Sequence, residues 1–145
     1  MGGDERVVRL SIPAKPEYIV LSRLALAGLA RFRTLPADTL ADLKLAVTEA
    51  CSNSVRHAYD GNHGGQVEIV YRLETDRLVV DVLDDGPGFP EQQPRRFPEQ
   101  QLRRDEPDES GLGLAIIRSL TDELELGGRD GRPGARLRFM KKLAE

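Results

Sequence analysis

Apolar and polar residues alternate in three short segments of the chain, which is typical of β-strands with one buried face, and a fourth segment, residues 78–83, is apolar on both faces except at Asp81. Val67, Ile69 and Tyr71, for example, share one side of the second segment. The predicted strands cover residues 6–12, 66–73, 78–83 and 135–141. Because only a short polar connection joins the second strand to the third, these two strands predict an antiparallel hairpin.

Apolar residues spaced three and four positions apart predict three helices, which cover residues 17–33, 36–59 and 111–124. In the second helix, one apolar stripe needs a core to bury it. The stripe consists of Leu40, Leu43, Val47, Cys51 and Val55. Pro36 occupies a favourable position for the start of this helix. Turn-forming residues predict breaks in the chain at 60–65 and 127–134.

The expected order of elements, β-α-α-β-β-loop-α-β-β, includes one further strand near the C-terminus for which the pattern sets no bounds, and it predicts an α+β fold. It fits a two-layer α/β sandwich, in which a mixed, mostly antiparallel sheet carries helices on one face, better than a doubly wound parallel sheet. Residues 91–110 interrupt the pattern with three prolines and ten charged residues. A loop of this length is often a lid or a binding segment, and a solvated insertion without a role is the alternative.

Composition narrows the class of protein. The 145 residues are 39% hydrophobic and 31% charged, as expected of one globular domain spanning residues 1–145. A formal net charge of −3 argues against direct nucleic-acid binding. The single cysteine excludes an internal disulfide and suits a reducing compartment. No apolar run approaches the roughly 20 residues of a membrane span, so we expect a cytoplasmic protein.

A polar stripe in the long helix is the first candidate for chemistry. Glu49, Asn53 and His57 are four residues apart and therefore lie on one side, nearly opposite the apolar stripe. A carboxylate can polarise a hydroxyl group or a water, and an amide oxygen is a hard ligand suited to Mg²⁺. A plain amphipathic helix with a solvated polar face explains the same spacing, and from this helix alone neither interpretation is favoured.

Two glycine motifs flank the long loop. Asp84 ends the second hairpin strand and is followed by Gly86 and Gly88; a carboxylate there could accept a hydrogen bond from an amino group such as that of adenine. After the loop, Gly111 and Gly113 open a helix, where free backbone N–H groups attract phosphate. Each motif alone also fits an ordinary turn. The second is neither a Rossmann fingerprint nor a P-loop.

Together and in this order, the three motifs resemble the N box and the two glycine boxes of the GHKL ATPase/kinase superfamily. That superfamily has the Bergerat nucleotide-binding fold, a histidine-kinase-like ATPase domain. Within it, residues 48–59 are especially similar to the anti-sigma factor serine kinases of bacterial sporulation and general stress pathways. The resemblance extends from the first strand to the last and implies ATP and Mg²⁺ as cofactors.

The resemblance also implies roles for individual residues. Glu49 would be the catalytic carboxylate that acts on the incoming serine hydroxyl. Asn53 would coordinate the Mg²⁺ that bridges the phosphates of ATP. Asp84 would accept the adenine amino group, and Gly86 and Gly88 would shape that pocket.

Further contacts are implied at the second glycine box and in the loop. Four consecutive residues would wrap the phosphates as an ATP lid of about residues 90–110 closes: Ser110, Gly111, Leu112 and Gly113. His57 lies on the stripe of Glu49 and Asn53 and is a candidate nucleotide contact. The loop arginines are further candidates to contact phosphate or a partner protein; they are Arg95, Arg96, Arg103 and Arg104.

The function implied is that of an ATP-dependent protein-serine kinase and anti-sigma factor. It would sequester a sigma factor and phosphorylate an anti-anti-sigma antagonist on serine, and the family's N-terminal region contributes to a homodimer. The first alternative is an ATP-binding regulatory module that holds a partner without transferring phosphate. Less favoured are the catalytic domain of a histidine kinase and an ATPase of the chaperone or mismatch-repair type, because the chain lacks a phosphoacceptor hairpin and a transducer domain.

One position departs from the family pattern. The family usually has Gly-Thr before its last strand, with the threonine hydroxyl near the adenine-binding aspartate. This chain has Gly134 followed by Ala135. Loss of the hydroxyl could remove a water-mediated contact to the base, which bears on nucleotide affinity and not on the fold.

Overall fold

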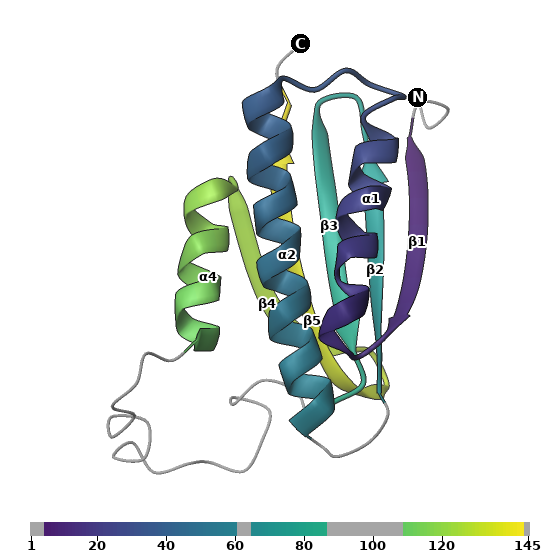
Figure 1. Cartoon of the computed structure of the whole chain (residues 1–145), viewed down its shortest axis with the longest axis vertical. Coiled ribbons are helices and arrows are strands. Elements are labelled where there is room, and N and C mark those ends of the chain that lie inside the picture. The colour runs from purple at the N-terminus through teal and green to yellow at the C-terminus, as the bar shows by residue number, and fades with distance from the viewer. Residues whose placement is uncertain (1–4, 61–64, 87–108, 144–145) are drawn as a thin grey trace.

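The computed structural model describes residues 5–60, 65–86 and 109–143 and has an α+β fold of two layers (Figure 1). The helical elements are the 3₁₀ turn η2 (Pro16–Tyr18), α1 (Val20–Leu29), α2 (Ala37–Asp60) and α4 (Glu109–Leu120). The strands are β1 (Arg6–Pro13), β2 (Gln66–Leu73), β3 (Arg77–Asp84), β4 (Glu123–Arg129) and β5 (Arg132–Lys142). This arrangement confirms the predicted fold class, and the predicted loop and lid of residues 90–110 fall mostly outside the described residues.

The five strands form one sheet in the order β1-β2-β3-β5-β4, and the four pairings between the described strands are all antiparallel. The predicted hairpin is confirmed, with Val67 opposite Asp84. On the other side of β3, Asp84 lies opposite Ala135 of β5. Asp84 is therefore flanked by two strands at the point where β3 ends.

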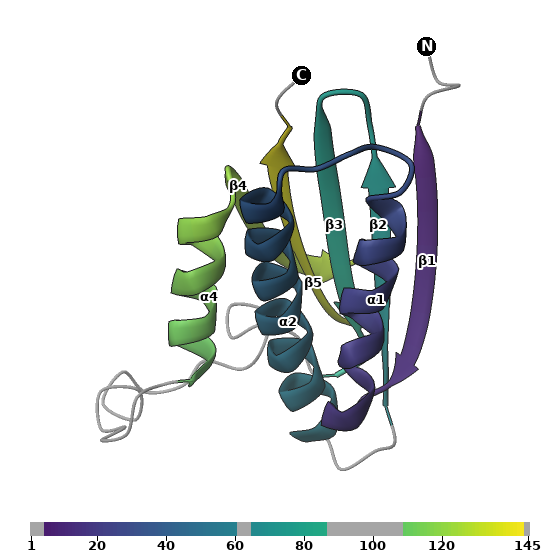
Figure 2. The ribbon, with the colours of Figure 1, turned by 45° about the horizontal axis from the view of Figure 1, so that its top comes forward.

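The helices cover one face of the sheet, with α2 in the middle, α1 over β1 and β2, and α4 beside α2 (Figures 1 and 2). Alternate strand residues point into this layer. Tyr71 and Phe139 are the largest fully buried side chains of the core. The predicted apolar stripe of α2 is confirmed in the core, since Leu43, Val47 and Cys51 are fully buried.

A buried polar connection ties α1 to the sheet. The Tyr71 hydroxyl donates a hydrogen bond of 2.7 Å to the Ser22 backbone oxygen, and the Ser22 hydroxyl donates to the backbone oxygen of Ile19 at 2.6 Å. Cys51 lies against Ser22, and burial raises the pKa of its thiol to about 12. Burial likewise raises the pKa of Tyr71 above its usual range. Cys51 is thus a neutral core group, as its place on the apolar stripe predicted.

Two predicted helices are shorter in the structure. The segment 17–33 is not one helix: a 3₁₀ turn precedes α1, and α1 ends at Leu29 because the next amides switch to shorter bonds, Arg31 N–H to Gly28 and Phe32 N–H to Leu29. The helix predicted to reach Leu124 ends at Leu120. Leu124 instead belongs to a strand, β4, in which leucine and glutamate alternate.

The prediction of a turn over 127–134 is also wrong. Only Asp130 and Gly131 form the connection, as a two-residue hairpin loop in which Gly131 has a φ of +67°. Gly127 lies inside β4, where a side chain would crowd the Arg136 guanidinium of the neighbouring strand. The glycines here permit close packing between strands.

The face of the sheet opposite the helices is charged. Arg138 of β5 donates two hydrogen bonds to Asp81 of β3, at 2.7 and 3.0 Å, which raises the pKa of the guanidinium. Asp81 is only 5% exposed, and Arg136 lies 3.8 Å from the same carboxylate. Among the described residues, no helix is both long and apolar enough to cross a membrane.

Candidate functional site

The elements that carry the described candidate residues meet at one end of the molecule. The C-terminal half of α2, the N-terminal end of α4 and the C-terminal end of β3 all lie there (Figures 1 and 2). α2 places Glu49 and Asn53 one helical turn apart on one side. Asp84 is the last residue of β3 and shares the helix-facing side with Leu78, Val80 and Val82.

Asn53 is a buried polar residue with an unsatisfied acceptor. It is 2% exposed, and its Oδ1 has no hydrogen-bond partner in the described part of the chain. A buried acceptor left unpaired costs about 1–3 kcal/mol, so such an atom points to a ligand that completes it. An amide oxygen is a ligand that Mg²⁺ accepts.

A metal at Asn53 would need ligands besides protein side chains. Within residues 5–60, 65–86 and 109–143, no cluster of three or more histidine, cysteine, aspartate or glutamate side chains could hold a metal ion. Mg²⁺ commonly takes one or two protein ligands and completes its shell with phosphate oxygens and waters. Asn53 therefore fits a metal that arrives with a nucleotide better than a permanently bound metal.

Glu49 lies against the start of α4. Its side chain is half-buried, and a Cβ placed on the buried Gly113 would lie 3.1 Å from its Oε1. A side chain at position 113 would therefore make the tip of the Glu49 carboxylate shift by a few tenths of an ångström. Gly113 is the fifth residue of α4, so Glu49 is next to the turn whose backbone N–H groups have no helical acceptors.

The free amides of that turn belong to the predicted phosphate-binding segment. Ser110, Gly111 and Leu112 all lie in the first turn of α4, and Leu112 is 57% exposed. The amide groups and the helix dipole give this end of α4 a partial positive charge that attracts anions. Glu49, Asn53 and an anion-attracting helix end are thus side by side.

Asp84 is held in a fixed orientation. It is 1% exposed, and its Oδ1 accepts a hydrogen bond of 2.9 Å from the backbone N–H of Gly86. This bond closes a tight turn directly after the strand, which explains why the Asp-x-Gly spacing suits the position. A buried carboxylate with a set orientation can select a hydrogen-bond donor such as an amino group.

Gly134 and Ala135 pack against Asp84 from β5. Gly134 has a φ of +123°, and a Cβ at this position would overlap the Asp84 carbonyl oxygen. Ala135 is 1% exposed and directly opposite Asp84 in the strand register. The departure noted in the sequence therefore places a methyl group beside the candidate base-binding carboxylate.

Several predicted contacts cannot be located. Gly88 and the loop arginines Arg95, Arg96, Arg103 and Arg104 lie outside the described residues. The backbone of His57 is in α2, but its side chain is outside the described part, as is that of Ser110. The structure thus brings together Glu49, Asn53 and Gly113 and orients Asp84 and Gly86.

Sequence reasoning missed two contributions. The close approach of Gly113 to Glu49 depends on how α2 and α4 pack, and no local signal encodes that distance. Arg129 contacts the backbone oxygen of Asp84 from β4, a strand that the sequence did not delimit. The positive φ of Gly134 could have been suspected from the Pro-Gly pair at 133–134, which is typical of a turn.

This chain is similar to known proteins over most of its length. A family described as histidine kinase-like ATPase domain matches residues 12–141. Serine-protein kinase RsbW of Bacillus subtilis is 35% identical over 97% of this chain and 89% of its own length. Serine-protein kinase RsbW of Listeria innocua is 37% identical over 82% of this chain and 78% of its own.

Solved structures show the same fold. The RsbU and RsbW domains of Rv1364c from Mycobacterium tuberculosis superpose with a TM-score of 0.66 at 16% identity, over 97% of this chain and 33% of that one. The catalytic domain of histidine kinase ThkA superposes with a TM-score of 0.54 at 16% identity, over 94% of this chain and 97% of that domain.

Proposed function

This chain belongs to the histidine kinase-like ATPase family, and from that premise we propose that it is an ATP-dependent protein-serine kinase and anti-sigma factor. It sequesters a sigma factor and phosphorylates an anti-anti-sigma antagonist on serine, in a cytoplasmic sporulation or general stress pathway. The relatives named serine-protein kinases support the reaction, since they match this chain over most of its length.

One observation carries the proposal: the Oδ1 of the buried Asn53, which has no partner in the described part of the chain, lies one helical turn from Glu49, and Glu49 lies against the start of α4. These are the groups that phosphoryl transfer from ATP requires. A hard oxygen ligand suits a metal, amide donors suit phosphate, and a carboxylate can orient a hydroxyl nucleophile.

Phosphoryl transfer depends mostly on positioning and on neutralising charge. Asn53 would hold Mg²⁺, which neutralises the phosphate oxygens of ATP when it is bound. The first-turn amides of α4 would hold the phosphate chain, and Asp84 would accept the amino group of adenine. Glu49 would accept the proton of the serine hydroxyl as that oxygen attacks the γ-phosphorus and the β,γ-bridging oxygen departs.

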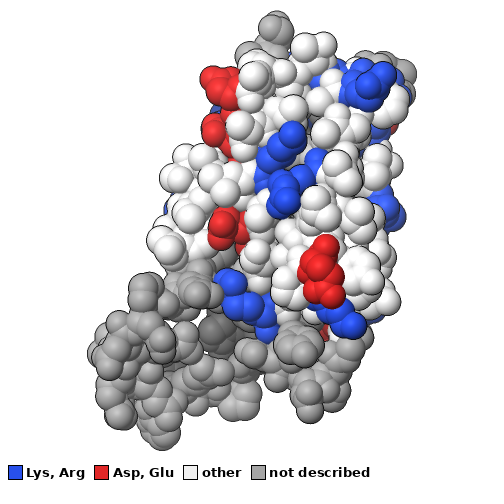
Figure 3. Space-filling view, in the orientation of Figure 1, with Lys and Arg blue, Asp and Glu red and all other residues white. Residues whose placement is uncertain are grey.

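An exposed apolar surface on α1 supports a homodimer or a protein partner. Val20, Leu21 and Leu24 are 43%, 38% and 62% exposed, and charged groups on the helical face are separated by uncharged surface (Figure 3). Arg23 of the same helix donates a 3.0 Å hydrogen bond to Thr48, the residue before Glu49. Through this hydrogen bond, a partner that binds α1 could influence the position of α2, the helix that carries Glu49.

The proposal is tested with γ-labelled ATP, Mg²⁺ and the purified anti-anti-sigma protein of the same organism. An acid-stable label that mass spectrometry places on a serine supports the kinase. An acid-labile label would indicate a histidine kinase instead. Tight ATP binding with no transfer to an unphosphorylated antagonist would leave a nucleotide-dependent binding module.

Sigma-factor sequestration needs its own measurement. The purified sigma factor should co-elute with the protein in the presence of ATP and be released when unphosphorylated antagonist is added. A sigma factor that never co-elutes would contradict the anti-sigma function but would leave the proposed kinase activity unaffected.

The proposed dimer is tested at α1. Leu24→Glu puts a charge in the apolar surface of α1, so it should weaken the dimer, which analytical ultracentrifugation measures.

A further inference from the structure

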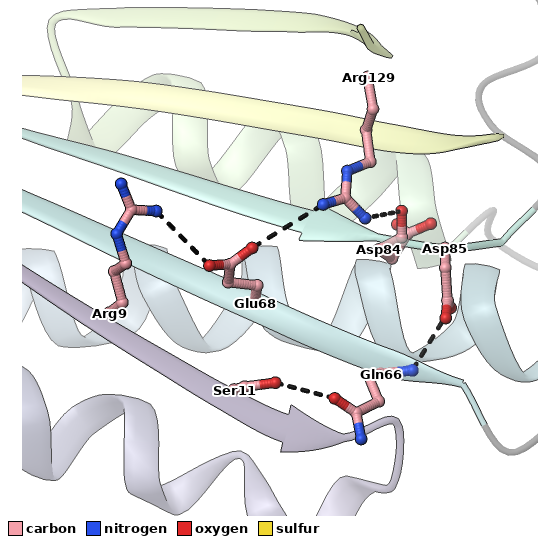
Figure 4. Close-up of polar contacts among 7 residues, drawn as sticks. All are labelled: Arg9, Ser11, Gln66, Glu68, Asp84, Asp85 and Arg129. Carbon is pink, nitrogen blue, oxygen red and sulfur yellow. Dashed lines mark hydrogen bonds and ion pairs between the residues drawn. The ribbon is translucent and has the colours of Figure 1, made fainter. Parts of the chain in front are cut away.

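A chain of charged side chains crosses the open face of the sheet and ends at Asp84 (Figure 4). Arg9 of β1 lies 3.5 Å from one carboxylate oxygen of Glu68 on β2. Arg129 of β4 lies 3.8 Å from the other oxygen of the same carboxylate. A second nitrogen of Arg129 donates a 3.4 Å hydrogen bond to the backbone oxygen of Asp84 on β3.

The position of Arg129 explains how it reaches so far. The β4–β5 pairing has an irregularity between Gly128 and Arg129, and such a bulge redirects the side chain that follows it. The side chain then passes over β5 at Gly134, where a Cβ would lie 3.0 Å from the Arg129 Cδ. A glycine at 134 is therefore needed both for its own backbone and for the path of this arginine.

Arg129 is packed and not merely lying on the surface. Its side chain is 12% exposed, whereas that of its ion-pair partner Glu68 is 34% exposed. A guanidinium held by a carboxylate on β2 and a carbonyl on β3 fixes these two strands relative to β4. The group that it fixes is the last residue of β3, whose carboxylate is oriented by the turn at Gly86.

We propose that Arg129, anchored by Glu68, is a positioning residue that fixes the end of β3 and thereby aims the Asp84 carboxylate at the adenine amino group. The inference rests on the proposed role of Asp84 in binding the base. Arg129 does not contact the nucleotide, because it lies on the face of the sheet opposite the helices. It acts only through the backbone of Asp84.

The effect expected is a loss of base selectivity. An amino group that no longer meets a well-aimed carboxylate binds less tightly, while contacts to the phosphates are unchanged. Arg129→Met should lower the affinity for Mg·ATP about three- to tenfold and leave the weaker affinity for Mg·GTP unchanged. Maximal phosphotransfer at saturating ATP should stay at the wild-type rate, so KM rises and kcat does not.

Two further variants keep the test independent of folding. Arg129→Lys retains a donor and a charge and should recover part of the ATP affinity. Glu68→Gln leaves Arg129 in place but weakens its anchor, so it should give an intermediate loss. Arg132→Met is the matched control for surface charge, because Arg132 lines the same hollow of about 270 Å³ on this face and its side chain is exposed, whereas that of Arg129 is packed.

The experiment measures ATP and GTP dissociation constants by fluorescence titration for these variants and for Asp84→Asn. If Asp84→Asn lowers ATP preference and Arg129→Met does not, the positioning role is overturned and the proposed role of Asp84 stands. If Asp84→Asn keeps the wild-type preference for ATP over GTP, the proposed role of Asp84 and the positioning role of Arg129 are both overturned. Equal losses for Arg129→Met and Arg132→Met would also overturn it, because they would reflect surface charge alone.

Discussion

Glu49 and Gly113 meet where α2 crosses the start of α4: a Cβ at position 113 would lie 3.1 Å from the Glu49 Oε1. This distance is tighter than most contacts of a real Cβ atom, so a side chain at 113 has to displace the carboxylate. The absence of a side chain at Gly113 therefore defines where the proposed catalytic carboxylate lies relative to the phosphate-binding turn.

Gly113→Ala should reduce phosphotransfer at least tenfold, because shifts well below 1 Å in a catalytic group are costly. The free energy of unfolding should change by less than about 1 kcal/mol, since alanine is the better helix former. Steady-state transfer and urea unfolding measure the two effects. Ala115→Ser, at an exposed position of the same helix, is the control and should keep the wild-type rate. A Gly113→Ala enzyme with that rate would show that Glu49 needs no fixed position.

Asn53→Ala should separate stability from ligand binding. Removing an Oδ1 that has no partner within residues 5–60, 65–86 and 109–143 relieves a penalty of about 1–3 kcal/mol and leaves a small cavity, so the apo protein should melt within a few degrees of wild type. The rise in Tm that saturating Mg·ATP gives the wild-type protein should disappear. Differential scanning fluorimetry with and without Mg·ATP measures both, with Ser52→Ala as the control on the same helix. An unchanged Mg·ATP shift in Asn53→Ala would rule out this oxygen as a ligand.

Gly134→Ala should destabilise the fold strongly. At a φ of +123° its Cβ would overlap the Asp84 carbonyl oxygen, so the cost should exceed about 3 kcal/mol. Gly131→Ala is the matched control: its φ is +67° and a Cβ there meets open space, so the cost should stay near 1–2 kcal/mol. Urea unfolding followed by circular dichroism measures both. Similar losses in the two variants would contradict the close packing at Asp84.

Stability should fall as the pH rises above about 9. The folded pKa of Cys51 is about 12 against an ordinary value of 9.0, so the unfolded thiol ionises first and draws the equilibrium toward the unfolded state. The contribution of Cys51 is fully present below pH 9 and is lost as the pH rises toward 12. Tyr71, whose pKa is also raised from 10.0, acts in the same direction at higher pH. Each group adds a slope of up to about 1.4 kcal/mol per pH unit.

Denaturant unfolding between pH 8 and 11 measures this slope. In Cys51→Ala the decline should begin about one pH unit later, where the unfolded Tyr71 starts to ionise. The variant is less stable at every pH because of its cavity, so the comparison concerns slopes and not absolute values. Identical slopes in the two proteins would show that Cys51 is not the group responsible.

The sequence predicted the elements whose periodicity was unambiguous. The β2–β3 hairpin and α2 followed from alternation and from the apolar stripe through Val47 and Cys51, and the core confirms them. The end of α4 was wrong because Leu120 and Leu124 have helical spacing, while the alternation at 123–126 also fits a strand. The decision depends on tertiary contacts, such as the 2.7 Å bond from the Lys142 N–H to Asp122.

The sequence was enough to name candidate site residues, but not to predict how they lie relative to one another. The spacing of Glu49 and Asn53 already placed them on one side of a helix, but a solvated face had the same spacing. The burial of Asn53, whose Oδ1 has no hydrogen-bond partner among the described residues, argues against a solvated face, and helical spacing alone does not reveal that burial. The contact between Arg129 and Asp84 could not be predicted from the sequence, because it requires the strand order β3-β5-β4.

The most direct test of the account is single-turnover phosphotransfer from Mg·ATP to the unphosphorylated antagonist by Glu49→Gln. The exchange keeps the size of the side chain and removes its charge, so the Mg·ATP dissociation constant should stay within about threefold of wild type while transfer falls by two to four orders of magnitude. Glu123→Gln, the same exchange at an exposed position of β4, should transfer at the wild-type rate. A Glu49→Gln protein that phosphorylates the serine as fast as wild type would contradict the central claim.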